Sequence, residues 1–441
     1  MAEANPTLTE LAATISEAAQ ALTSYLEANN LPAPSFAEDG PADYPKAPEV
    51  IGARFQLLGA LHDLVHLAMG PTEYPFIQPI YWNHDGMVLD VLNQFNFFSA
   101  VPLGGSATYS EIAQATTVPE SIVRRIVRHA MTNRIFVESP PGSGRVAHTA
   151  TSAFLARNPL MGSWIGHNLE EARAAAVYLP ESLRRFSAEG APSEEVSESA
   201  FSVADVDRTG GLETYWDYLK RTPEGKPEGF RSNRFAEAMG AAAKIGSTVS
   251  GDDVVKSGYD WGSLGEATVV DVGGSTGFAS FVLAKEYPKL DLIVQDLPEI
   301  EASFKSHVPQ DLTHRVTFQP HDFFTPQTVP ADVYFLKMIL HDWPDKYAVR
   351  ILRNLIPSLK PGGRILLCES VAPPDNAPLP LILRRLASLT DLQMLIACNS
   401  KERTLEDWQA LAKEADGRLE ARLSNFMPGS LWNIVELVLS G

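Results

Sequence analysis

The sequence predicts an α/β fold, in which helices cover a parallel sheet, preceded by a smaller helical domain. From Ala267 onward, apolar segments of strand length alternate with amphipathic helical segments, which is typical of a parallel sheet with helical connections. Upstream, three helical segments and a hairpin pattern follow one another and predict a winged helix-turn-helix. At 441 residues, the chain is long enough for two or three domains.

The composition narrows the class of protein. With 54 acidic and 36 basic residues, the formal net charge is −18, which argues against nucleic acid or an anionic membrane as a partner. The two cysteines, Cys368 and Cys398, lie outside any C-x-x-C or Cys/His spacing, so we expect no disulfide framework and no metal site. The amino terminus is acidic, and no apolar run approaches the roughly 18 residues of a membrane span. We expect a soluble, cytoplasmic protein.

The first half of the chain is expected to be helical. Apolar residues recur every three or four positions between residues 7 and 30, and a linker rich in Pro and Ala follows, so residues 1–48 are predicted to be a helix and a linker. Residues 49–186 are predicted to form the winged-helix domain after a helix at 50–69. Its predicted elements are helices at 87–102, 109–118 and 119–135 and a hairpin at 136–149.

A winged helix often binds DNA, and Arg124, Arg125 and Arg128 on its third helix would support that function. Fold does not determine function, however, and the rest of the chain is acidic. We therefore expect this domain to serve dimerisation or to cover a substrate.

The second half divides at a segment of small and acidic residues. Residues 187–211 are small, acidic and poor in large aliphatic side chains, and they are expected to be a flexible insertion. Residues 212–441 are expected to form the α/β domain. Its predicted strands lie at 267–274, 290–298, 315–323, 331–340 and 362–371.

A glycine turn follows the first predicted strand, at Gly273, Gly274 and Gly277. Such a turn can serve close packing alone. Asp271 precedes it, however, and Asp296 ends the next strand, where a carboxylate can accept hydrogen bonds from ribose hydroxyls. The spacing G-G-x-x-G after an acidic residue suits a ligand with a cationic amino group and sulfonium better than a pyrophosphate. S-adenosylmethionine is such a ligand.

Most of the chain resembles the plant and fungal small-molecule O-methyltransferases of the caffeate and flavonoid type, including their fungal pericyclase members. The resemblance rests on the winged-helix pattern and on six motifs in order: VDVGGSTG, QDLPE, HDFF, FLKMILHDWPD, LKPGGRILLCESV and NSKERTLEDWQALAKEA. It implies a Rossmann-like class I methyltransferase domain that binds S-adenosylmethionine, an N-terminal dimerisation domain and a homodimer. One departure is Ser275, where a third consecutive glycine is common.

The resemblance also implies roles for single residues. His341 would be the general base, with Glu369 and Glu402 holding its ring. Lys337 would lie beside the cofactor at the strand end, and Lys337 and Asp342 are also expected among the catalytic residues. The residues implied to bind the cofactor are Asp271, Gly273, Gly274, Gly277, Asp296, Leu297, Asp322, Phe323 and Lys337.

Elementary chemistry agrees with His341 as a base. If the strand at 331–340 runs on in extended form, Lys337 and His341 share one face at the carboxyl edge of the sheet, where ligands bind in such folds. A phenol, with a pKa near 10, needs a base, and imidazole suits that task. The alternatives are a satisfied strand-end histidine at 341 and a helix-start acid at Glu402.

Met338 and residues of two other segments, NPLMGSWIGHN and DLQMLIACN, are expected to line a largely apolar substrate pocket, although Met and aromatic residues at helical spacing also serve as core. They are Trp164, His167, Met338, Met394, Cys398 and Asn399.

The sequence therefore predicts an S-adenosylmethionine-dependent O-methyltransferase that acts on a phenolic or enolic hydroxyl of a polyketide-type natural product. The alternative is a pericyclase of the same fold, in which the cofactor is bound but not consumed and Lys337, His341, Asp342 and His167 donate hydrogen bonds to a substrate carbonyl.

Overall fold

The computed structural model describes residues 5–187, 190–250, 254–374, 377, 379–425 and 432–440. The chain divides into two compact units. The first contains residues up to 174 together with 222–244 and 379–383, and the second contains the remainder. This division differs from the predicted domains, because residues 175–186 belong to the second unit and residues 222–244 to the first.

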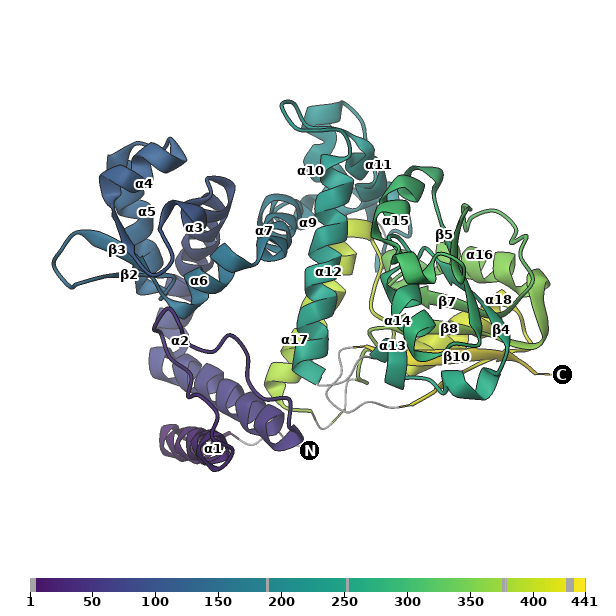
Figure 1. The fold of residues 1–441 in the computed structure, drawn as a ribbon, viewed down its shortest axis with the longest axis horizontal. Coiled ribbons are helices and arrows are strands. Elements are labelled where there is room, and N and C mark those ends of the chain that lie inside the picture. Colours follow the sequence, from purple (N-terminus) through teal and green to yellow (C-terminus); the bar gives the residue numbers. More distant parts are fainter. Residues whose placement is uncertain are drawn as a thin grey trace. The chain divides into compact units, whose positions relative to one another are not determined.

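Two long helices begin the first unit. Helix α1 (Leu8–Ala28) starts with a capping box between Thr7 and Glu10 and buries its predicted stripe against α2 (Figure 1). Helix α2 (Pro48–Gln94) is longer than predicted, because it kinks at Gly70 (φ 70°) and resumes. It ends before Asn96 (φ 55°), so the helix predicted at 87–102 is wrong as one element and is instead the end of α2 followed by α3 (Phe97–Ala100).

The helices and hairpin predicted after α3 are present. Helix α5 buries Val123, Val127 and Ala130, while Arg124, Arg125 and Arg128 are exposed. An unpredicted three-residue strand, β1, joins the hairpin in an antiparallel sheet of order β1-β3-β2. The bounds are β1 (Ser106–Thr108), α4 (Tyr109–Thr116), α5 (Glu120–Thr132), β2 (Phe136–Glu138) and β3 (Arg145–His148).

Further helices follow, among them a π-helical stretch at His167–Ala172. They are α6 (Ala150–Arg157), α7 (Pro159–Gly166), α8 (Arg173–Ala176), α9 (Leu179–Phe186), α10 (Ala200–Thr209), α11 (Tyr215–Lys220), α12 (Phe230–Ser250) and α13 (Val254–Ser257).

The prediction of a flexible insertion at 187–211 is wrong for most of its described residues. A 3₁₀ turn at Val196–Glu198 leads into α10, and Val196, Phe201 and Val203 are buried. These three apolar side chains anchor the segment although its average composition is acidic and small. Residues 188 and 189 of the predicted insertion lie outside the described residues.

The second unit contains a seven-stranded sheet of order β6-β5-β4-β7-β8-β10-β9. Strands β4 to β8 are parallel, as predicted, whereas β10 pairs antiparallel with β8 and β9 antiparallel with β10. The strands are β4 (Ala267–Val272), β5 (Leu290–Asp296), β6 (Val316–Pro320), β7 (Ala331–Lys337), β8 (Leu359–Glu369), β9 (Leu419–Leu423) and β10 (Asn433–Leu439).

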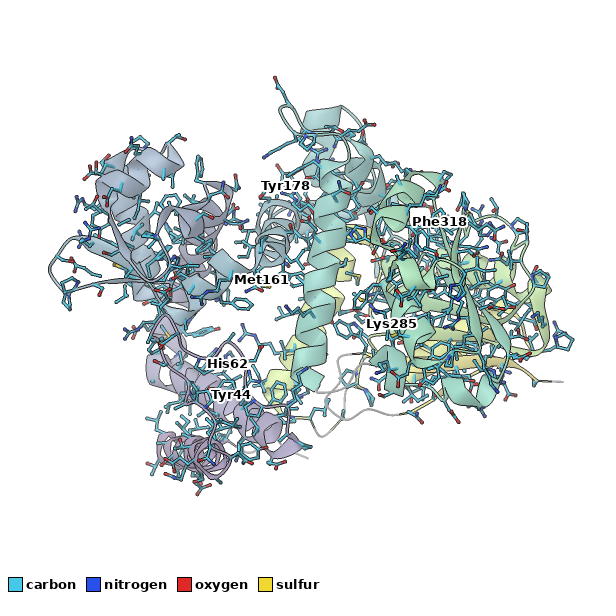
Figure 2. All side chains as sticks on the ribbon, in the orientation of Figure 1. Tyr44, His62, Met161, Tyr178, Lys285 and Phe318 are labelled. Carbon is cyan, nitrogen blue, oxygen red and sulfur yellow. The ribbon has the colours of Figure 1, made fainter. Side chains whose placement is uncertain are left out.

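Successive strand residues supply the cores on the two faces of this sheet, as the pleat requires. Val269 and Phe335 pack with α13, α14 and α15, a core that Phe318 of β6 borders (Figure 2). Val270 and Leu336 pack with α16 and α18 on the other face. These helices are α14 (Phe278–Glu286), α15 (Glu301–His307), α16 (Asp345–Leu355) and α18 (Leu405–Ala415), and α17 spans Leu381–Cys398. No helix among the described residues is long and apolar enough to cross a membrane.

Candidate active site

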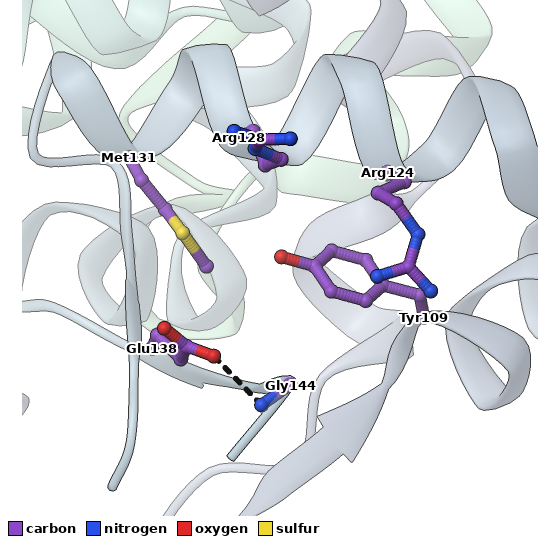
Figure 3. A pocket seen from close by; sticks show the side chains of 6 residues that line it. All are labelled: Tyr109, Arg124, Arg128, Met131, Glu138 and Gly144. Atoms are coloured by element: carbon purple, nitrogen blue, oxygen red, sulfur yellow. Dashed lines mark hydrogen bonds between the residues drawn. The ribbon is translucent and has the colours of Figure 1, made fainter. Parts of the chain in front are cut away.

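The first unit contains a cavity of about 370 Å³ beside α5 (Figure 3). In its lining, Arg124 lies over the Tyr109 ring at 4.3 Å and bonds Glu120, and Glu138 accepts from the Gly144 N–H at 2.7 Å. Among the described residues that line it, this cavity lacks buried carboxyl and imidazole groups that could take part in acid–base catalysis. Those groups gather in the second unit, at the carboxyl edge of the large sheet.

The glycine turn after β4 adopts the conformation that its residues allow. Gly273 has φ 72°, and a Cβ there would come within 2.6 Å of the Ile339 side chain. Gly277, which begins α14, has φ 86°, and its Cβ would meet Phe281 and Phe304 at 2.9 Å. Close packing alone therefore requires glycine at both positions. The glycines therefore do not indicate a ligand by themselves, whereas the acidic residues beside the turn do.

Two carboxylates flank this turn. Asp271 is buried and accepts from the Ser280 hydroxyl at 2.7 Å. Burial raises its pKa to about 6, although the Ser280 hydrogen bond and the charge of Lys337 oppose the rise. Asp296 accepts from the N–H groups of Leu297 at 2.8 Å and Ser275 at 2.9 Å, and burial raises its pKa as well.

The set of acceptors fits S-adenosylmethionine better than a phosphate ligand. Asp271 and Asp296 offer carboxylates to an amino group and to ribose hydroxyls, whereas a pyrophosphate would meet them with like charge. Asp322 and Phe323 follow β6 at the same edge. The Asp322 carboxylate accepts from the Phe324 N–H at 2.9 Å, and the Phe323 ring lies 5.9 Å from that of Trp343.

The strand that precedes His341 ends earlier than predicted. β7 stops at Lys337 because Met338 adopts a left-handed conformation, with φ 55°, and a 3₁₀ turn follows at Leu340–Asp342. The expectation that His341 shares a strand face with Lys337 is therefore wrong. A turn, and not the pleat of the sheet, places His341.

Glu369, at the end of β8, is fully buried but holds a different group from the one predicted. Its Oε1 accepts from the backbone N–H groups of Ile339 at 3.1 Å and Leu340 at 2.8 Å. Glu369 thus secures the turn before His341, and no hydrogen bond from the described residues joins it to the imidazole.

Glu402 does contact the ring. Nδ1 of His341 lies 3.2 Å from the Glu402 carboxylate, and Nε2 lies 3.7 Å from that of Asp342. Burial alone would lower the pKa of His341, but Asp342, Glu369 and Glu402 outweigh it and raise that pKa to about 10. Burial raises the pKa of Asp342 to about 7; the charge of His341 opposes this rise and the two glutamates add to it. His341 therefore carries a proton at neutral pH.

The predicted substrate residues divide between the units. Of those in the second unit, Met338 and Met394 are partly buried, Cys398 is buried, and Asn399 donates to the Glu195 carbonyl at 2.9 Å. Burial, and then the charge of Asp342, raise the pKa of the Cys398 thiol, so Cys398 lies near the histidine cluster.

Trp164 and His167 belong to the first unit. His167 begins the π-helical stretch, is buried, and lies 3.1 Å from the carboxylate of Glu171. Arg234 bonds Glu171 and, at 2.6 Å, Glu170.

One buried residue of the second unit was not predicted. Arg403 follows Glu402, is fully buried, and donates to the turn that carries His341. In the sequence, Arg403 appears only as an arginine just ahead of Thr404, the residue that caps α18. The sequence does not show that the arginine side chain points into the protein.

Together, the sheet order, the glycine turn and the acidic carboxyl edge define a class I methyltransferase domain. The chain belongs to the O-methyltransferase family: the model of the O-methyltransferase domain matches residues 228–417, and the O-methyltransferase pyvH of Aspergillus violaceofuscus is 34% identical over 99% of this chain and 100% of its own. The family uses S-adenosylmethionine.

Solved structures share the fold. One is the O-methyltransferase NcsB1 from neocarzinostatin biosynthesis, in complex with S-adenosylmethionine and 2-hydroxy-5-methyl naphthoic acid, which is 25% identical over 81% of this chain and 96% of its own with a TM-score of 0.64. Another is described as a pericyclic reaction enzyme, 20% identical over 96% of this chain and 100% of its own with a TM-score of 0.69. At that identity, the second likeness concerns the fold alone.

Proposed function

We propose that this enzyme transfers a methyl group from S-adenosylmethionine to a phenolic or enolic hydroxyl of a polyketide-type small molecule, with His341 taking the proton. The observation that carries this proposal is the buried His341 whose Nδ1 faces Glu402. A carboxylate at one ring nitrogen fixes the tautomer and stabilises the imidazolium that proton transfer produces.

The residues at the sheet edge would hold the cofactor. Asp271 and the backbone at Gly273 would bind its methionine part, Asp296 its ribose, and Asp322 and Phe323 its adenine. When bound, the cofactor supplies an electrophilic methyl group on a positively charged sulfur.

His341 would act on the hydroxyl of the substrate. The hydroxyl oxygen gives its proton to the imidazole as it gains the methyl group, and a positioned base of this kind typically contributes about 10² to 10⁴ in rate. The pKa of His341, about 10, matches that of a phenol, so transfer between them is nearly balanced. Because only the neutral imidazole can accept a proton, the rate should rise with pH above 7.

A polyketide-type aromatic substrate is supported by the residues near the cluster and by a family relative. Met338, Met394 and Cys398 offer an apolar surface in the second unit. NcsB1, whose structure contains a naphthoic acid, acts in natural-product biosynthesis.

A second candidate function is pericyclic catalysis with the cofactor bound but not consumed. It is favoured by the carboxylates of Glu402 and Asp342 beside the ring of His341, which raise its pKa and would let the protonated ring donate a hydrogen bond to a substrate carbonyl. The 34% identity to a named O-methyltransferase favours methyl transfer.

Mass spectrometry with methyl-labelled S-adenosylmethionine and a panel of phenolic and 2-pyridone polyketides tests the two candidates. Methyl transfer predicts a product heavier by one labelled methyl and an equal amount of S-adenosylhomocysteine. An isomerised or dehydrated product with intact cofactor would establish the pericyclic reaction instead. His341→Ala should lose methyl transfer by about 10² to 10⁴ while calorimetry still detects cofactor binding; retained turnover would contradict the role of His341 as base.

We also propose that the protein is a homodimer. The support is a set of apolar side chains exposed along α2, including Phe76 at 73% and Ile80 at 45% exposure, one helical turn apart.

A further inference from the structure

We propose that Arg403 is a positioning residue, whose guanidinium fixes the turn that carries His341 in the geometry needed for catalysis. This inference rests on the proposed function and gives a role to a residue of the motif NSKERTLEDWQALAKEA to which the sequence analysis assigned none. Arg403 is fully buried, which is rare for arginine and requires that its donors be satisfied.

The donors of Arg403 converge on one short segment. Nη1 donates to the carbonyl of Leu340 at 2.9 Å, and Nη2 donates to that of Trp343 at 2.8 Å. The guanidinium therefore bonds the carbonyls on both sides of His341 and Asp342. Nε and Nη2 also donate to the Asp345 carboxylate at 2.9 and 2.7 Å, which balances the buried charge.

The backbone of Leu340, the residue before His341, is thereby held at both its N–H and its carbonyl. The N–H of Leu340 donates to Glu369 from β8, and its carbonyl accepts from Arg403. The backbone of Arg403 is itself anchored, because Ala372, just beyond β8, donates to its carbonyl at 2.9 Å. Since Glu402 is the adjacent residue, one anchored dipeptide holds both the ring of His341 and the turn beneath it.

This arrangement matters because the turn is not part of the sheet. β7 ends at Lys337, so no strand pairing fixes residues 339–342. A misplacement of about 1 Å can cost on the order of 10²-fold in rate. A lysine at 403 would keep the charge but would lose the planar fork that reaches two carbonyls and a carboxylate together.

The test compares Arg403→Lys with Arg315→Lys. Arg315 is a matched control, because its guanidinium also donates to backbone carbonyls, those of Ala284, Tyr287 and Leu290, but at the opposite edge of the sheet. We expect Arg403→Lys to lower kcat about 100-fold while the Kd for S-adenosylhomocysteine and the KM of the substrate change by less than about threefold. Arg315→Lys should lower kcat by less than about threefold.

A second readout does not depend on methyl transfer. The imidazole N–H resonance of His341, identified by its loss in His341→Gln, should shift or disappear in Arg403→Lys and stay unchanged in Arg315→Lys. If the wild-type protein methylates no substrate, the proposed function fails, whereas this spectrum still tests the role of Arg403.

Equal kcat values for the two lysine variants, or an unchanged His341 resonance in Arg403→Lys, would overturn the proposal. Should Arg403→Lys fail to fold, Asp345→Asn replaces it, because that change loosens the same guanidinium. It is expected to lower kcat about tenfold; a kcat within twofold of wild type would equally overturn the proposal.

Discussion

At the scale of single residues, the candidate site buries three carboxyl groups beside a single imidazole, so one positive charge faces up to three negative charges. Asp342, Glu369 and Glu402 surround one imidazole. Sequence motifs predicted that these residues belong together, and the contact between His341 and Glu402 agrees with that prediction. The partner of Glu369 could not be predicted, because a motif does not tell whether a carboxylate faces a side chain or backbone N–H groups.

Asp342→Asn is expected to stabilise the protein at alkaline pH. The folded pKa of Asp342, about 7, lies above its unfolded value near 3.9, so the folded state holds an extra proton between these values and stability falls as pH rises through that window. Asparagine removes this cost, which is about 4 kcal/mol because the two pKa values differ by roughly three units at about 1.4 kcal/mol each. Each kcal/mol corresponds to roughly 2–4 °C in Tm. Differential scanning fluorimetry should show the Tm gain at pH 8 and little gain at pH 4.

Asp416→Asn serves as a control of opposite sign. Arg418 lowers the pKa of Asp416 to about 2, so its carboxylate is favoured in the folded state and its replacement should not raise Tm at pH 8. A lower Tm for Asp342→Asn than for wild type at pH 8 would show that its carboxylate contributes more than it costs.

At the scale of elements, helices α1, α4 and α5 and the five parallel strands followed from periodicity, whereas α6, α7 and α12 were not predicted. Periodicity failed where a single residue changes the backbone. Asn96 and Met338 both adopt positive φ, and neither interrupts the apolar pattern around it. Strands β9 and β10 were not predicted, although they complete the sheet next to β8.

Met338→Ile should be more harmful than Met338→Gly, although isoleucine is the closer match in size. A β-branched residue resists the left-handed conformation at this position, whereas glycine adopts it freely. We expect Met338→Ile to lower the free energy of unfolding by about 1–3 kcal/mol, and Met338→Gly to change it by about 1 kcal/mol or less. Urea denaturation of both variants measures the difference, and the reverse order would contradict the assigned backbone conformation.

At the scale of the whole molecule, the two units fold around separate cores, and the predicted domain boundaries missed how the chain passes between them. Residues 222–244 return to the first unit after the chain has entered the second. Composition could not reveal this, because the sequence of α12 is typical of a helix and does not indicate which unit the helix packs in.

The double variant Phe76→Asp/Ile80→Asp should convert the proposed dimer into a monomer. Two charges on adjacent turns of α2 would be buried without partners in an interface, which costs several kcal/mol. Sedimentation equilibrium should give twice the mass of one chain for wild type and the single mass for the variant. Val177→Asp is the control, because Val177 is equally exposed at 73% but lies in the second unit. A monomeric wild type would refute the dimer.

The left-handed residue at the end of β7 has a consequence for how this fold diversifies. Before Met338, each side chain is committed to one face by the pleat, so an insertion or deletion would invert the packing of the whole strand. After it, the turn is free of that parity, so a change of length there would not invert the packing of the strand. New chemistry can therefore evolve in the turn without rebuilding the scaffold, and the same segment is the place to graft sequences from other members of the fold.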